Sequence, residues 1–217
     1  MAQSALVLGG TGLIGTHLIK YLTGSDHWSD IAVLTRRPLN VKYDGVTEII
    51  GDATNVSRVL ADCKPDVVFC CLGTTRKKAG SRKRFREIDH DYVVKCAEIL
   101  KRQGAQRFLF VSALGAKVGS LSYYSHVKGE TERDLSAIGF EALDILRPSL
   151  LLGERHEARF AEDIAGTIMP FFSGLLVGSA RKYRPIEAIQ VAKAMSEIAC
   201  SDKLGVTVYE SDKLARF

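Results

Sequence analysis

Gly9-Gly10-Thr11-Gly12-Leu13-Ile14-Gly15 is the stretch of sequence that decides the fold. It follows a short apolar run, Ser4 to Leu8, that is typical of a buried strand. The residues after the glycines recur at helical spacing, namely Leu13, His17, Leu18 and Leu22. The sequence therefore predicts a strand, a tight glycine turn and a helix at the front of the chain.

The spacing of the glycines in this turn also indicates a ligand. Residues without a Cβ atom let the backbone approach a pyrophosphate, whose charge is met by free amides and by the helix dipole. A plain tight turn is the alternative, but the position between strand and helix favours nucleotide binding. The expected cofactor contacts here are Gly9, Thr11, Gly12, Leu13, Ile14 and Gly15.

The residues after the second expected strand distinguish between two nucleotides. An NAD site usually carries an acid there for the ribose 2′-hydroxyl, whereas this chain has Arg36 and Arg37. Guanidinium groups pair well with phosphate oxygens, so NADP(H) is the expected cofactor and NAD(H) the less favoured one. Solvent-exposed arginines without a ligand are the alternative.

Two later strand ends supply further candidates for the cofactor site. Asp52 follows the third expected strand, where it either contacts the adenine or caps the next helix. Leu72, Gly73 and Thr74 end the fourth, where a glycine lets the backbone pass close to the nicotinamide ribose.

The rest of the chain alternates between strand and helix patterns. Further strands are expected at Ile31 to Leu34, Val46 to Ile50, Val67 to Leu72, Phe108 to Val111 and Ala142 to Leu146, with Val206 to Tyr209 a candidate for one more. Helices are expected up to about Asp62 and at Phe85 to Gln103, Leu121 to Ile138 and Pro185 to Cys200. This pattern predicts one α/β domain over residues 1–217, a Rossmann-type doubly wound parallel sheet with helices on both faces. Residues from about 150 to 185 are expected to form a small C-terminal lobe over the substrate.

Ser112, Tyr124 and Lys128 are the candidate catalytic residues. Ser112 ends the fifth expected strand, while Tyr124 and Lys128 lie four residues apart on one helical face. A lysine ammonium stabilises a nearby phenolate and lowers a pKa that is normally near 10. We therefore expect Tyr124 to exchange a proton with a substrate oxygen that Ser112 orients. Tyr123 lacks a matching lysine and is expected to be a packing residue.

These motifs together resemble the short-chain dehydrogenase/reductase superfamily. Several stretches are most similar to its atypical members related to the Tat-interacting protein oxidoreductases, namely Gly73-Thr-Thr-Arg76, Asp91-Tyr-Val-Val-Lys95, Val127-Lys-Gly-Glu130 and Arg147-Pro-Ser-Leu-Leu-Leu152. The resemblance implies a Rossmann fold, NADP binding, a ribose contact from Lys128 and reductase activity. The chain departs from the pattern at Asp89, where many relatives carry an asparagine.

The charge is concentrated in one short segment. The chain has 217 residues and a net charge of +5, and Arg76 to Arg86 contains seven of its basic residues and no acid. A solvated loop and the attraction of an anionic substrate are both open for this segment. Nucleic-acid binding is not expected, because only Phe85 interrupts the charges.

Composition bounds the remaining expectations. The five cysteines lack the paired spacing of a zinc site, so no metal is expected. No apolar window is long enough to span a membrane, and we expect a cytoplasmic protein without a membrane partner. The expected activity is an NADP(H)-dependent oxidoreductase acting on a small carbonyl or alcohol substrate. A homodimer is a further possibility, and an NADP(H)-binding regulatory protein without turnover is the alternative.

Overall fold

A computed structural model describes residues 2–153 and 177–217 of the chain. The central sheet has the order β3-β2-β1-β4-β5-β6-β9, and its neighbouring strands pair in parallel. The strands are β1 (Gln3–Leu8), β2 (Trp28–Thr35), β3 (Val46–Ile50), β4 (Val67–Cys70), β5 (Arg107–Val111), β6 (Ala142–Arg147) and β9 (Gly205–Glu210). The predicted Rossmann-type sheet is confirmed, and the added strand near Val206 is its last member.

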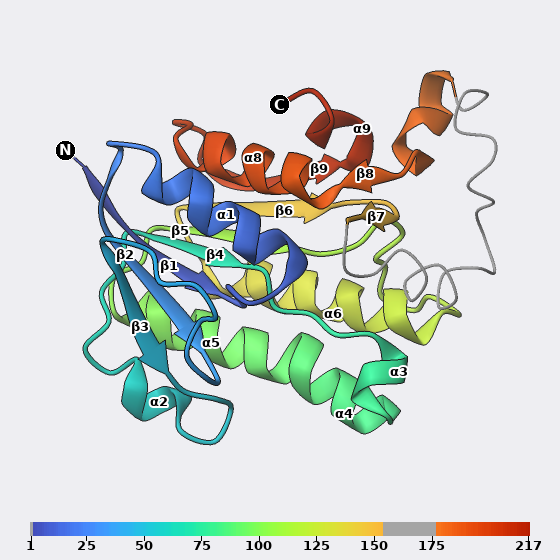
Figure 1. Ribbon diagram of the computed structural model, residues 1–217. Helices are drawn as coiled ribbons and strands as arrows, with labels where there is room; N and C mark the ends of the chain where they lie inside the picture. Colours follow the sequence, from blue (N-terminus) through green and yellow to red (C-terminus); the bar gives the residue numbers. More distant parts are fainter. Residues whose placement is uncertain (1, 154–176) are drawn as a thin grey trace.

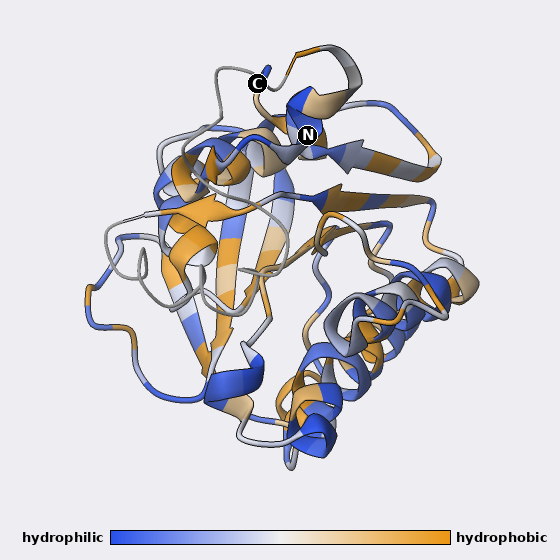
Figure 2. Cartoon of the chain, turned by 90° about the vertical axis from the view of Figure 1, so that its right-hand side faces the viewer, coloured by the Kyte–Doolittle hydropathy of each residue, from blue (hydrophilic) through white to orange (hydrophobic). Residues whose placement is uncertain are grey.

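Helices cover both faces of this sheet (Figure 1). Successive residues of β1 point to opposite sides: Ala5 and Val7 belong to one apolar core, Leu6 and Leu8 to the other. The first core packs under α1 (Leu13–Thr23) and α8 (Ala188–Ala199), which contact each other. The second packs under α2 (Val56–Val59), α5 (Tyr92–Arg102) and α6 (Tyr123–Ile138). Figure 2 shows the hydrophobic colour concentrated in the interior between these layers.

Two helices begin later than the sequence pattern predicts. α6 begins at Tyr123, because the Ser122 hydroxyl accepts a hydrogen bond from the Ser125 amide as an N-cap. α8 begins at Ala188, because the preceding residues form a short strand, β8 (Ile186–Glu187), that pairs with β7 (Leu151–Leu152). The helical periodicity was therefore predicted correctly and the helix starts were not.

The basic segment is helical, which corrects its interpretation as a solvated loop. It forms α3 (Arg76–Ala79) and α4 (Arg82–Arg86), and the helix continues through a π-helical turn, η1 (Glu87–Asp91), into α5. Thr75 and Ser81 cap the two short helices with their side-chain oxygens. Phe85 is fully buried and anchors α4 to the rest of the protein.

The tail returns to the sheet. A 3-10 helix, η3 (Gly178–Tyr183), precedes β8, and α9 (Ser211–Leu214) follows β9. Most of the lobe expected at about residues 150–185 lies outside the described residues, and the elements of it that the structure describes are β7 and η3. No helix in the described ranges is long and apolar enough to cross a membrane.

Candidate functional site

The glycine turn lies where the strands end and is held by close backbone contacts. Gly9 has a φ of +83°, and a Cβ atom there would lie 2.8 Å from the Cys71 carbonyl oxygen. A Cβ atom on Gly15 would overlap the Gly9 carbonyl oxygen. Gly12 is the N-cap of α1 and supplies no side chain, so the helix begins without a side-chain cap. Thr11, Leu13 and Ile14 lie on the same turn, at a helix start of the kind whose amides can bind a pyrophosphate.

The side chains beyond β2 and β3 are close to one another. Arg36 and Arg37 are exposed directly after β2, and Arg36 is near enough to Asp52 to act on it electrostatically. One oxygen of Asp52 accepts hydrogen bonds from the amide and the hydroxyl of Thr54, at 2.8 and 2.5 Å. These bonds lower the pKa of Asp52 below its ordinary value. Asp52 thus stabilises its own turn, and the N-cap of α2 is Asn55.

The loop after β4 lies over a buried ion pair. Leu72 and Thr74 are half-buried, and a Cβ atom on Gly73 would lie 3.5 Å from the Asp89 carboxylate and 3.7 Å from Lys128 Nζ. The Thr74 amide donates to the second Asp89 oxygen at 2.8 Å. The bare backbone of Gly73 therefore lies directly beside these two charges.

Lys128 is almost fully buried and has three neighbours around its ammonium. Nζ lies 3.0 Å from Asp89 Oδ1, donates to the Val111 carbonyl at 3.4 Å, and is 4.9 Å from the centre of the Phe110 ring. Burial alone would lower the pKa of Lys128, but Asp89 and Tyr124 raise it above its ordinary value. Lys128 is thus a fixed positive charge at the start of α6.

Tyr124 lies one helical turn before Lys128, as the spacing predicts. Its ring centre is 5.5 Å from that of Phe85 in α4. Burial raises the pKa of Tyr124, the nearby charge of Lys128 lowers it, and Asp89 raises it, with a net increase. The prediction that lysine lowers this pKa below its ordinary value is therefore wrong, because burial outweighs Lys128 and because Asp89 compensates its charge. Such a phenol holds its proton at neutral pH and is suited to donate it.

Ser112 directly follows β5, as predicted, and its hydroxyl has a partner that the sequence did not predict. Its hydroxyl donates a short hydrogen bond to the Glu132 carboxylate. Arg147 holds the same carboxylate through two hydrogen bonds, at 3.0 and 2.5 Å. Ser112, Glu132 and Arg147 thus form a buried link between β5, α6 and β6, and the Ser112 hydroxyl is already engaged.

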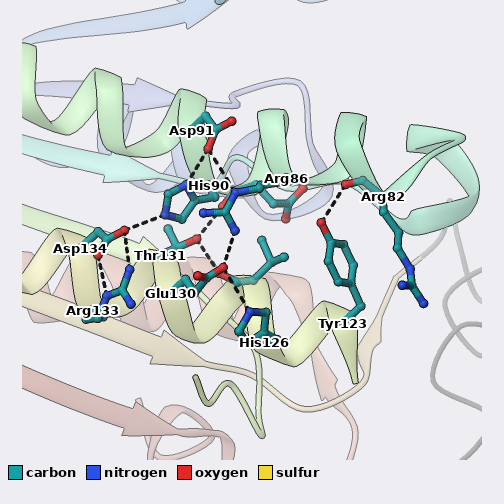
Figure 3. A network of polar contacts seen from close by, with 12 residues as sticks. Arg82, Arg86, His90, Asp91, Tyr123, His126, Glu130, Thr131, Arg133 and Asp134 are labelled. Carbon is teal, nitrogen blue, oxygen red and sulfur yellow. Dashed lines mark hydrogen bonds and ion pairs between the residues drawn. The ribbon is translucent and has the colours of Figure 1, made fainter. Parts of the chain in front are cut away.

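Polar contacts fasten α4 and η1 to α6 (Figure 3). Arg86 forms a short ion pair with Glu130, and the ring of His90 contacts Asp91 and Asp134 at 2.7 and 2.8 Å. The Tyr123 hydroxyl donates to the Arg82 carbonyl at 3.0 Å, and its ring centre lies 6.1 Å from that of Phe85. These contacts hold η1, which carries Asp89, in a fixed position against α6, which carries Lys128.

Sequence reasoning missed three contributors to this site, which are Phe85, Asp89 and Glu132. Asp89 stood out only as a departure from a family pattern, and its pairing with Lys128 needs the π-helical turn to be known. Glu132 lies four residues after Lys128, a spacing that places both on one face of α6. Phe85 was visible as the one aromatic residue among the basic ones.

Comparison with known proteins places the chain in context. The family model described as the NAD dependent epimerase/dehydratase family matches residues 5–168. The chain is 36% identical to "Protein FMP52, mitochondrial" of Kluyveromyces lactis, over 91% of this chain and 89% of that protein. It is 34% identical to "Protein HTATIP2" of Rattus norvegicus, over 89% of this chain and 79% of that protein. These matches confirm the resemblance drawn from the motifs.

Solved structures share the fold. "MoeE5 in complex with UDP-glucuronic acid and NAD" superposes with a TM-score of 0.71 at 20% identity, covering 94% of this chain and 75% of that one. The Bordetella bronchiseptica enzyme WbmH, in complex with NAD+, gives a TM-score of 0.71 at 15% identity, covering 97% and 76%. At such identities the likeness is one of fold.

One expectation is overturned by the relatives. The prediction of a cytoplasmic protein is wrong, because relatives from several yeasts carry the name "Protein FMP52, mitochondrial". The prediction followed from the lengths of the apolar windows, which do not identify a compartment.

Proposed function

The chain belongs to the NAD dependent epimerase/dehydratase family, and from this premise we propose that it is an NADP(H)-dependent oxidoreductase for a small carbonyl or alcohol substrate. Tyr124 is the proposed acid and base, and Lys128 holds charge beside it and contacts the nicotinamide ribose. The observation that carries the proposal is that Lys128 Nζ lies beside Gly73 in the loop after β4, while Tyr124, one helical turn earlier, is near enough to interact with that charge.

The preference for NADP(H) is supported by the residues around the expected adenosine end. Arg36 and Arg37 are exposed after β2, and no acid takes the position that would bind a 2′-hydroxyl. Asp52 is near, but its carboxylate already accepts two hydrogen bonds from Thr54. A 2′-phosphate would find two guanidinium groups there and one partly compensated acid.

The proposed carbonyl reduction depends on the protonation state of the Tyr124 phenol. NADPH, when bound, supplies a hydride to the carbonyl carbon. Tyr124 transfers its proton to the carbonyl oxygen as negative charge develops there, which gives the alcohol, and in the reverse direction it accepts that proton. Lys128 stabilises the resulting phenolate. With its pKa raised, Tyr124 is protonated at neutral pH, which is the form that a proton donor to the carbonyl oxygen must have.

An anionic substrate is supported by the basic residues of α3 and α4. Phe85 packs against Tyr124, so α4 lies beside the proposed acid. Arg82 is exposed, with its guanidinium 5.2 Å from the centre of the Tyr123 ring. Charges at the mouth of a site raise the local concentration of an oppositely charged substrate.

Tyr124→Phe tests the proposal, with the neighbouring Tyr123→Phe as a matched control. The first variant should lower kcat for NADPH-dependent carbonyl reduction by roughly 100-fold or more, because the proton donor is lost. Its calorimetric Kd for NADPH should stay unchanged. Tyr123→Phe should retain turnover, because that hydroxyl only binds the Arg82 carbonyl. Equal turnover in both variants would contradict the role of Tyr124.

A regulatory NADP(H)-binding protein is a second candidate, and one observation favours it. The Ser112 hydroxyl is engaged by Glu132, and a substrate oxygen would have to displace that bond. A protein that binds NADPH tightly, reduces no member of a broad carbonyl panel and is unaffected by Tyr124→Phe would match this candidate.

A further inference from the structure

Asp89 is a carboxylate in a fully buried place. It lies in η1, where the Tyr92 amide bonds to the Glu87 carbonyl five residues back. The π-helical turn leaves the Asp89 carbonyl to accept a hydrogen bond from the Thr131 hydroxyl at 3.0 Å. Thr131 also bonds the Val127 carbonyl at 2.9 Å, so η1 is tied to the turn of α6 that carries Lys128.

The two Asp89 oxygens have different partners. Oδ2 accepts from the Thr74 amide at 2.8 Å, and Oδ1 lies 3.0 Å from Lys128 Nζ without another hydrogen bond among the described residues. Burial raises the pKa of Asp89, and Lys128 and the Thr74 amide oppose that increase. Without the ammonium, a charged carboxylate would be very costly at this depth.

Other groups that face the pair do not replace either partner. Tyr124 reaches it from α6, and Cys70 reaches it from β4. Burial raises the pKa of the Cys70 thiol to about 12, so it is neutral near pH 7. Phe110 and the Val111 carbonyl complete the surroundings from β5. The charge of Lys128 is therefore balanced chiefly by Asp89.

We propose that Asp89 is a positioning residue that holds Lys128 charged beside Tyr124 and ties it to the loop after β4. The inference rests on the proposed function in one respect, because Asp89 contributes to the reaction only if Tyr124 and Lys128 have their proposed roles. Asp89 acts on the reaction only through Lys128 and through the Thr74 amide. The ordering of the proposed nicotinamide loop and the charge of the lysine thus depend on one carboxylate.

A double-mutant cycle in urea tests the pairing without any substrate. Asp89→Asn keeps an acceptor for the Thr74 amide but removes the charge, and should raise the unfolding equilibrium constant about 100-fold or more. Lys128→Met should raise this constant by a similar factor. The double variant should raise it by far less than the product of the two factors. Glu197→Gln breaks the exposed pair with Lys193 as a control and should change the constant less than about 5-fold.

The pH dependence separates a charge role from a packing role. In Asp89→Asn the unpaired Lys128 has a folded-state pKa below its unfolded value of roughly 10.4. The folded state then binds fewer protons than the unfolded state, so the stability deficit of this variant should shrink as pH rises from about 7 to about 10. A stability deficit of Asp89→Asn that does not change with pH would overturn the proposal. A double variant whose unfolding constant rises by the product of the two single effects would also overturn it.

Two further outcomes keep the test decisive. If Asp89→Asn does not fold but the double variant does, the pairing is supported directly. If the double variant also fails while Lys128→Met folds, Asp89 acts independently of Lys128 and the proposal is wrong. In an active enzyme, Asp89→Asn should add a limb to the kcat profile, with activity lost as Lys128 deprotonates. Inactive wild-type protein would refute the proposed function and leave the unfolding cycle interpretable.

Discussion

Single side chains at the ends of β2 and β3 set the electrostatics of the proposed adenosine end. Arg36 and Arg37 are exposed, so neither is committed to the apolar cores. Arg36 acts on Asp52, whose carboxylate is stabilised by Thr54. A dianionic 2′-phosphate would therefore meet an excess of positive charge here, and a neutral 2′-hydroxyl would gain much less from it.

The double variant Arg36→Ala/Arg37→Ala tests this selectivity. It should weaken NADPH binding by about 10-fold to 100-fold, because charge-assisted hydrogen bonds to the phosphate are lost. NADH binding should be unchanged in the same calorimetric titrations. Arg102→Ala, at the far end of α5, is the matched control and should affect neither nucleotide. Equal losses for NADPH and NADH would remove the argument for NADP(H).

For single residues, the spacing along one helix could be predicted from the sequence, whereas the orientation of a side chain could not. Tyr124 and Lys128 are four positions apart, which places them on one face of α6 whatever surrounds them. The direction of the Ser112 hydroxyl depends on Glu132, which is distant in sequence and is itself held by Arg147. The raised pKa of Tyr124 was missed for a related reason, since the predicted lowering requires Lys128 to lack a buried acid partner.

Among the elements, α4 connects the basic segment to the proposed site. Its charged residues suggest a solvated loop, yet Thr75 and Ser81 cap two short helices and Phe85 is fully buried. Caps are readable in a sequence. The burial of Phe85 was not, because it depends on the Tyr123 and Tyr124 rings of α6.

Phe85→Ala should show that α4 is part of the folded scaffold. The cavity left beneath α4 should lower the free energy of unfolding by about 3 to 5 kcal/mol in urea titrations. Turnover should also fall, because Tyr124 loses the ring against which it packs. Arg82→Ala removes an exposed cation–π contact with Tyr123 and should cost less than about 1 kcal/mol. If Phe85→Ala lowers the free energy of unfolding only slightly, the interpretation of the basic segment as a solvated loop would be favoured again.

Across the whole molecule, the amino ends of the strands are fastened separately from the proposed site. Arg107 at the start of β5 lies 3.0 Å from Asp144 of β6, and both are buried. The same guanidinium donates to the carbonyl of Ala199, the last residue of α8, and to those of Ser201 and Lys203 in the loop before β9. One side chain thus joins β5 and β6 to this loop, at the edge opposite the glycine turn.

Arg107→Met should therefore separate stability from binding. The variant removes the cationic partner of Asp144 and a donor to three carbonyl groups, and should lower the free energy of unfolding by roughly 3 kcal/mol or more. The calorimetric Kd for NADPH should stay within about twofold of wild type, because the change lies at the other edge. A large loss of affinity with intact folding would show that the two edges are coupled.

The parallel sheet with helices on both faces was predictable because strand and helix patterns alternate along the chain, whereas the order of its strands comes from the structure. The pairing of β9 with β6 has a consequence for synthesis. Until residues 205–210 have emerged from the ribosome, β6 of the nascent chain has an unpaired side with open amides and carbonyls. A stalled or proteolytically clipped chain that lacks these residues would present that side to other chains, and aggregation would be its expected fate.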